Sequence, residues 1–145
     1  MGLNQYQASS VQVSLRMLEE ALLTVDRLMR DESRGVLHRT ILDIPEEQRR
    51  QIMELSHEAQ DIIAQLAQEF NLGRVETPVH QMVTAQLSSA WESLEDTRPA
   101  TLKRYGEVDP GLERTLGPGI GRLIELVLAM GVLARQEPDE RSAKS

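Results

Sequence analysis

The sequence predicts an all-α protein: a four-helix-bundle-like domain with up-down topology and a broken, kinked connection between the third and fourth main helices. The apolar residues are mostly Leu, Ile, Val, Ala and Met, with only 3% aromatics. That composition suits helices better than strands. Long segments repeat apolar residues every three or four positions, which is typical of amphipathic helices. No segment alternates apolar and polar residues strictly, and no Asn-Gly or Asp-Gly hairpin turn is present.

The first helix is predicted to begin at Ser9 or Ser10, which suit an N-cap, and to run to about residue 43. Residues 1–8 are predicted to be a flexible N-terminus. Gly35 lies inside this helix, costs about 1 kcal/mol relative to alanine and marks an expected bend. The apolar seam has the spacing of near-parallel helix packing and consists of Val11, Leu15, Leu18, Leu22, Val25 and Met29.

Pro45 is expected to end the first helix and to open the second, which is predicted over residues 46–71. Asn71-Leu72-Gly73 is a typical C-terminal stop. The short connections favour antiparallel neighbours. The predicted inner seam consists of Ile52, Leu55, Ala59, Ile62, Leu66 and Phe70.

Thr77 and Pro78 predict the N-cap and first position of the third helix. Its predicted seam consists of Val83, Leu87, Ala90 and Leu94. Pro99 ends or kinks this helix, and one or two further turns are expected before Gly106. Asp109-Pro110 should open a short helix that Gly117 closes.

The last helix is predicted from about Pro118 to Gln136, and between Leu123 and Ala134 only Glu125 is charged. A helix that is apolar around most of its circumference has to be covered. A membrane span needs about 20 apolar residues; this run is shorter, so no membrane contact is expected. The cover is then either the rest of the chain or the same helix of a second copy. We favour the second copy, with an interface formed by Leu126, Leu128, Met130 and Leu133. The polar residues 137–145 are predicted to be a disordered tail.

The chain has 145 residues and a formal net charge of −7, so we expect one domain over residues 9–136 that does not bind nucleic acid. Cysteine is absent, which excludes disulfides, thiolate metal sites and cysteine nucleophiles. The N-terminal residues lack the basic and apolar regions of a signal peptide. These features favour a cytoplasmic protein.

The glycine-rich start of the last helix is the strongest candidate ligand site. Backbone N–H groups at a helix start can bind an anion, and arginines lie nearby in the sequence. The candidate residues are Arg114, Gly119, Gly121 and Arg122. No predicted strand precedes them, so the dinucleotide fingerprint and the phosphate loop do not apply. The competing interpretation is that these glycines only allow close helix packing.

Other chemical groupings are incomplete. Glu54 and His57 have the Glu-x-x-His spacing of di-iron bundles, but only one copy is present. The acidic group of Glu92, Glu95 and Asp96 lacks a recognisable second acidic pair for magnesium. No catalytic residue, metal ligand or cofactor is therefore predicted.

These observations predict a non-enzymatic helical bundle that acts through protein–protein contact, as a homodimer or with another protein partner. The alternative is a binder of a small anionic ligand, or an enzyme acting on one, that uses the glycine-rich start of the last helix. A third interpretation is a metal-dependent helical-bundle enzyme.

Overall fold

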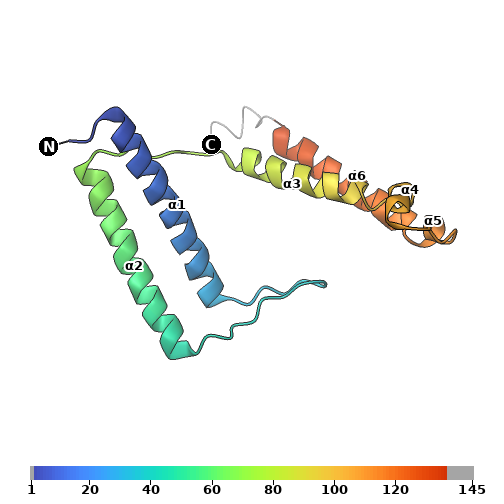
Figure 1. Ribbon diagram of the computed structural model, residues 1–145, viewed down its shortest axis with the longest axis horizontal. Coiled ribbons are helices and arrows are strands. Elements are labelled where there is room, and N and C mark those ends of the chain that lie inside the picture. Colours follow the sequence, from blue (N-terminus) through green and yellow to red (C-terminus); the bar gives the residue numbers. More distant parts are fainter. Residues whose placement is uncertain (1, 137–145) are drawn as a thin grey trace. The chain divides into compact units, whose positions relative to one another are not determined.

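The computed structural model describes residues 2–136 and is shown in Figure 1. Within this range the regular elements are helices, apart from one isolated β-bridge between Arg34 and Arg39. The elements are α1 (Gln5–Arg30), α2 (Glu46–Glu69), α3 (Val79–Glu95), α4 (Pro99–Leu102), the 3₁₀ helix η1 (Lys103–Tyr105), α5 (Leu112–Thr115) and α6 (Gly117–Arg135). The all-α class is confirmed, and so are four long helices with a broken connection between the third and fourth.

The chain divides into two compact units, residues 1–75 and 76–145. The first unit is a hairpin of α1 and α2, and the second a hairpin of α3 and α6. The prediction of a single domain over residues 9–136 stays a prediction. The predicted polar tail, residues 137–145, lies outside the described residues.

Helix α1 begins earlier than the sequence predicts, because Asn4 supplies a complete capping box. The Asn4 side chain accepts a hydrogen bond from the Gln7 backbone N–H at 2.8 Å, and the Gln7 side chain accepts one from the Asn4 N–H at 3.0 Å. Two backbone donors that lack helical partners are thereby satisfied. The prediction that Ser9 or Ser10 is the N-cap is wrong, because both lie inside the helix.

Helix α1 also ends earlier, at Arg30 rather than near residue 43, because Asp31 adopts extended backbone angles of φ −135° and ψ 141°. Residues 31–45 form a projecting segment that we call the arm (Figure 1). Gly35 and His38 close a tight turn within it, since the Gly35 N–H donates to the His38 carbonyl at 2.8 Å. Gly35 therefore lies in this turn and not in a bent helix.

Helix α2 matches its predicted range closely, and its stop is the one that the sequence indicates. Asn71 adopts the left-handed conformation, with φ 51°. The Leu72 N–H donates to the Ala67 carbonyl at 2.8 Å, and the Asn71 N–H to the Gln68 carbonyl at 3.3 Å. This pattern is a Schellman motif, which satisfies carbonyl groups that the helix leaves unpaired.

The face of α2 that packs on α1 overlaps the predicted inner seam but is turned from it. Ser56 and Ile63 are the buried residues of α2; Leu55 and Ile62 of the seam are exposed, whereas its other four members, Ile52, Ala59, Leu66 and Phe70, are half-buried. At 100° per residue the two buried residues centre about 60° around the helix from the middle of the predicted seam. The α1 side contributes the buried Asp26, next to half-buried Leu22 and Val25 along the same helix.

In the second unit, α3 and α6 lie side by side and antiparallel (Figure 1). Pro78 is the N-cap of α3, one residue later than the predicted Thr77. Pro99 begins α4, and the chain turns at Gly106, as predicted. Gly117 begins α6 instead of closing α5, because α5 and α6 are separated only by Leu116.

Candidate functional site

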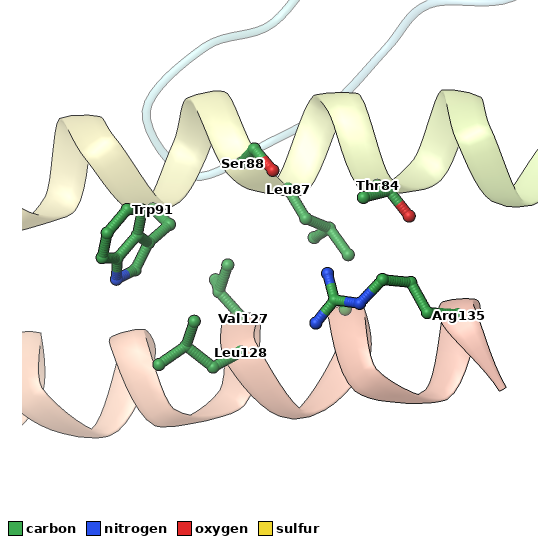
Figure 2. Close-up of a pocket in the computed structure, with 8 residues that line it drawn as sticks. Thr84, Leu87, Ser88, Trp91, Val127, Leu128 and Arg135 are labelled. Atoms are coloured by element: carbon green, nitrogen blue, oxygen red, sulfur yellow. The ribbon is translucent and has the colours of Figure 1, made fainter.

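The contact between α3 and α6 uses one narrow face of α6. Ile124, at 3% exposure, and Gly131 are the buried residues of this helix. Figure 2 shows a shallow groove at this contact, with the single tryptophan, Trp91, beside it. The groove is lined by Thr84, Leu87, Ser88 and Trp91 from α3 and by Val127, Leu128, Gly131 and Arg135 from α6.

A second apolar face of α6 is exposed. Its members are spaced by three, four and three residues, which is the heptad spacing of a helix-packing seam. At 100° per residue they centre roughly 140° around the helix from Ile124 and Gly131. We call this face the α6 seam: Leu123, Leu126, Met130 and Leu133, with exposed fractions of 47%, 41%, 47% and 65%.

The structure sorts the four predicted interface residues onto two faces of α6. Leu126, Met130 and Leu133 belong to the α6 seam. Leu128 is 49% exposed, but it lies on the other side of the helix and lines the groove near Trp91 (Figure 2). Leu123 belongs to the seam although the sequence analysis did not include it, and its position three residues before Leu126 was the signal that could have found it.

Of the residues in the predicted anion site, Arg114, Gly119 and Arg122 are exposed and Gly121 is half-buried. The Arg122 guanidinium forms an exposed ion pair with Glu125 at 3.1 Å. A Cβ added at Gly119 or Gly121 would meet nothing within 4 Å, so packing does not require either glycine. The close-packing interpretation is therefore wrong for these two glycines. Arg114 lies exposed on the short helix α5. The anion site itself stays a prediction.

The acidic residues near the end of α3 are paired with arginines. The distance from Glu95 to Arg98 is 2.7 Å and from Asp96 to Arg104 is 3.2 Å. The Arg98 hydrogen bond lowers the pKa of Glu95. Within residues 2–136 no group of three His, Asp or Glu side chains is arranged to hold a metal ion.

A buried polar cluster lies at the contact between α1 and α2, and sequence reasoning did not find it. The Gln60 Nε2 donates to Asp26 Oδ2 at 2.9 Å and to Ser56 Oγ at 3.1 Å. The Gln60 hydrogen bond is the main cause that lowers the pKa of Asp26. Asp26 Oδ1 is buried and accepts no hydrogen bond from the described residues. The cluster joins the two helices through the hydrogen bond from Gln60 to Asp26.

Helix α6 is also long and apolar enough to cross a membrane, judged by length and composition alone. Only 11% of its most apolar window is buried within the structure. Core helices of soluble proteins, which are mostly buried, and signal sequences near the N-terminus meet the same measure. The exposed α6 seam is thus the feature of the second unit that most needs an explanation.

Comparisons with models of protein families, with curated proteins and with solved structures give no match for this chain.

Proposed function

We propose that this chain is a non-enzymatic helical protein that acts through protein–protein contact, and that its first partner is a second copy of itself. The contact is formed by the α6 seam, Leu123, Leu126, Met130 and Leu133. In the cell this interaction module works in the cytoplasm. The single observation that supports the proposal is the exposure of these four residues at heptad spacing.

The α6 seam is an exposed apolar surface with regular spacing. Soluble monomers rarely expose contiguous apolar patches of more than a few hundred Å², and larger ones mark interaction sites. Covering apolar surface stabilises a contact by about 25 cal/mol per Å². A seam of Leu and Met at heptad spacing matches an identical seam by interdigitation. A second copy of the chain always supplies such a surface.

A lipid bilayer is the competing environment for the same helix. Arg122 and Glu125 lie within the first half of α6, and Arg135 ends it. Charged side chains within a hydrocarbon core are costly, whereas in a protein dimer Arg122 and Glu125 can stay in water. We therefore favour a protein partner. Gentle lysis of the native host followed by fractionation distinguishes the two, because a membrane-spanning chain sediments with lipid and a dimer does not.

The decisive experiment measures the mass of the full-length protein by sedimentation velocity and native mass spectrometry over a series of concentrations. The wild type is expected at twice 16.3 kDa. Leu126→Glu and Met130→Glu are expected to give monomers, because each buries a charge in the seam. Val132→Glu is the matched control, since Val132 is exposed on the same helix but lies off the seam.

Two readouts separate loss of the dimer from loss of the fold. Helix content by circular dichroism and the fluorescence of Trp91, which borders the groove between α3 and α6, should stay unchanged in both seam variants. A wild type that is monomeric at every soluble concentration contradicts the proposal. Loss of the helical signal in both variants also contradicts it, because the seam would then belong to the core of the subunit.

A further inference from the structure

The two sides of the arm between α1 and α2 are joined by an isolated β-bridge and by hydrogen bonds. Besides the turn that Gly35 and His38 close, the Thr40 N–H donates to the Ser33 carbonyl at 2.8 Å, and the Ser33 N–H donates to the Thr40 Oγ1 at 2.7 Å. At the base of the arm, the Glu32 carboxylate accepts a hydrogen bond from the Leu42 N–H at 3.3 Å. A Cβ on Gly35 would come within 3.0 Å of the His38 carbonyl oxygen. The sequence and backbone of the arm thus specify one local structure.

The arm tip, Val36 and Leu37, is the most exposed apolar pair of the described chain. Their exposed fractions are 100% and 98%. They occupy the two central positions of the turn. Both have negative φ, since the one non-glycine residue with positive φ in the described range is Asn71. Hairpin turns of two residues favour positive φ, with Asn or Gly. Neither residue is therefore explained by the demands of the turn.

The residues that flank the tip also oppose the stability of the arm. Arg34 and Arg39 are paired across the arm by the β-bridge. Like charges directly opposite one another destabilise a strand pair. Arg34 is partly neutralised by Glu32 at 3.3 Å, whereas Arg39 forms no ion pair within residues 2–136. Both the apolar turn residues and the opposed arginines are thus unfavourable for the arm itself, and such a conflict indicates a binding role.

A complementary surface lies on the outer face of α2, which we call the α2 strip: Leu55, Glu58 and Ile62. Residues three and four apart are neighbours on a helix. Leu55 and Ile62 are exposed at 65% and 48%, and the Glu58 carboxylate between them is exposed and makes no ion pair among the described residues. The strip therefore offers two apolar side chains and one carboxylate, where the arm tip offers two apolar side chains and the Arg39 cation.

We propose that the arm tip of one copy docks on the α2 strip of a second copy, so that Val36 and Leu37 cover Leu55 and Ile62 while Arg39 pairs with Glu58. This contact rests on the self-association proposed above and adds a second, charge-matched interface to it. Both copies carry both halves, so two equal contacts form in a two-fold symmetric pair.

The competing occupant of the arm tip is an anionic lipid surface. Asp31, Glu32 and Asp43 lie at the base of the arm, and the whole chain has a formal charge of −7. A uniformly negative plane would attract Arg34 and Arg39 but repel the base of the arm within about one Debye length, ~8 Å. The α2 strip instead carries a single carboxylate, that of Glu58, which can pair with Arg39 without facing the acidic residues at the base of the arm.

The test uses three variants of the full-length chain in sedimentation equilibrium. Val36→Ser with Leu37→Ser is expected to raise the dissociation constant of self-association at least about 100-fold, because two apolar side chains lose their cover. Arg39→Glu and Glu58→Arg are each expected to raise it about 10-fold. Arg39→Glu also removes the repulsion from Arg34, so its effect cannot come from loss of the arm.

The charge swap is the discriminating measurement. In a mixture of Arg39→Glu chains with Glu58→Arg chains, one contact of the mixed dimer carries the reversed pair and the other carries the native pair. The mixed dimer should therefore recover the wild-type dissociation constant. Arg74→Glu and Val75→Ser, exposed positions in the segment after α2, serve as controls and should change nothing.

The outcomes separate this inference from the proposed function. A wild type that stays monomeric overturns both. A wild type that self-associates and dissociates with Leu126→Glu, while the arm variants behave like Arg74→Glu, overturns the arm contact alone. Arm variants that keep wild-type self-association but lose binding to vesicles of phosphatidylcholine with phosphatidylserine overturn it in favour of lipid. Recovery in the charge-swapped mixture supports it.

Discussion

Gln60 of α2 donates a hydrogen bond to Asp26 of α1 across the contact between the two helices, with 2.9 Å between Nε2 and Oδ2. The same amide nitrogen also donates to Ser56 on its own helix. Ile63, at 7% exposure, is the one buried apolar residue of this hairpin in the described structure. A polar link therefore fixes how α1 and α2 pair where apolar packing is sparse, as buried polar residues fix register in some helix pairs.

Removing one partner of this link should destabilise the hairpin more than removing both. Gln60→Leu leaves the Asp26 carboxylate buried without its donor, which lowers the melting temperature. The double variant Asp26→Leu with Gln60→Leu replaces the pair by apolar side chains and should recover most of the loss. Thermal unfolding followed by circular dichroism measures both. A double variant that melts below Gln60→Leu would show that the link itself is the main stabilising contact.

Acid should destabilise the first unit through Asp26 and Glu32. The Gln60 hydrogen bond lowers the pKa of Asp26, and the Leu42 N–H lowers the pKa of Glu32. A carboxyl whose pKa is lower in the folded state stabilises the fold fully above its unfolded pKa, roughly 4, and loses that contribution as the pH falls through the folded value. The melting temperature should thus fall with pH below about 4.

Asp26→Asn tests the assignment of this pH dependence. The variant has no titrating group at this position, so its melting temperature should fall less steeply with acid than that of the wild type. Asp31→Asn, close in sequence to Glu32, is the comparison. Equal slopes in the wild type and Asp26→Asn between about pH 4 and pH 2 would refute the role of Asp26.

The position of the first N-cap can be tested by two alanine substitutions. Asn4→Ala removes the capping box and should lower the free energy of unfolding by about 1 kcal/mol. Ser9→Ala lies inside α1, where alanine favours helix, and should be neutral or stabilise by up to about 0.5 kcal/mol. Urea denaturation measures both. If Ser9→Ala has the larger cost, the helix begins where the sequence analysis placed it.

Substitution of Gly121 tests whether it is an ordinary open position of α6 or part of an anion site. Because no atom lies within 4 Å of an added Cβ, Gly121→Ala should raise the free energy of unfolding by about 0.5–1 kcal/mol. Inorganic phosphate should leave the melting temperature of the wild type unchanged. A phosphate-induced rise that both Gly121→Ala and Arg122→Ala abolish would instead support the anion site.

Much of the secondary structure could be predicted because its causes are local. Pro45 and Asn71 delimit α2, and Pro99 and Gly106 bound the broken connection after α3. The end of α1 could not be predicted in this way. The residues after Arg30 contain no proline until Pro45, and it is the contacts of Glu32, Ser33 and Thr40 across the arm that hold them out of a helix.

The candidate surfaces were predictable only in part. The apolar excess of α6 pointed to an interface, and Leu126, Met130 and Leu133 do share one exposed face. Leu128 was assigned to the same interface because it is apolar, yet it lies toward α3. The arm tip was missed because Val36 and Leu37 fit the apolar spacing of a longer first helix.

The sequence by itself determined the helical class, the bounds of α2 and α3 to within a few residues, and the presence on the last helix of more apolar surface than one face can hold, because propensity and apolar spacing act within a few residues. Only the tertiary structure decided which face packs. On α2 the contact face is turned by about 60° from the predicted seam, so that Ser56 and Ile63 are buried while Leu55 and Ile62 are exposed. Apolar spacing leaves a rotation of this size open, so it depends on the partner helix and on hydrogen bonds such as that from Gln60 to Asp26.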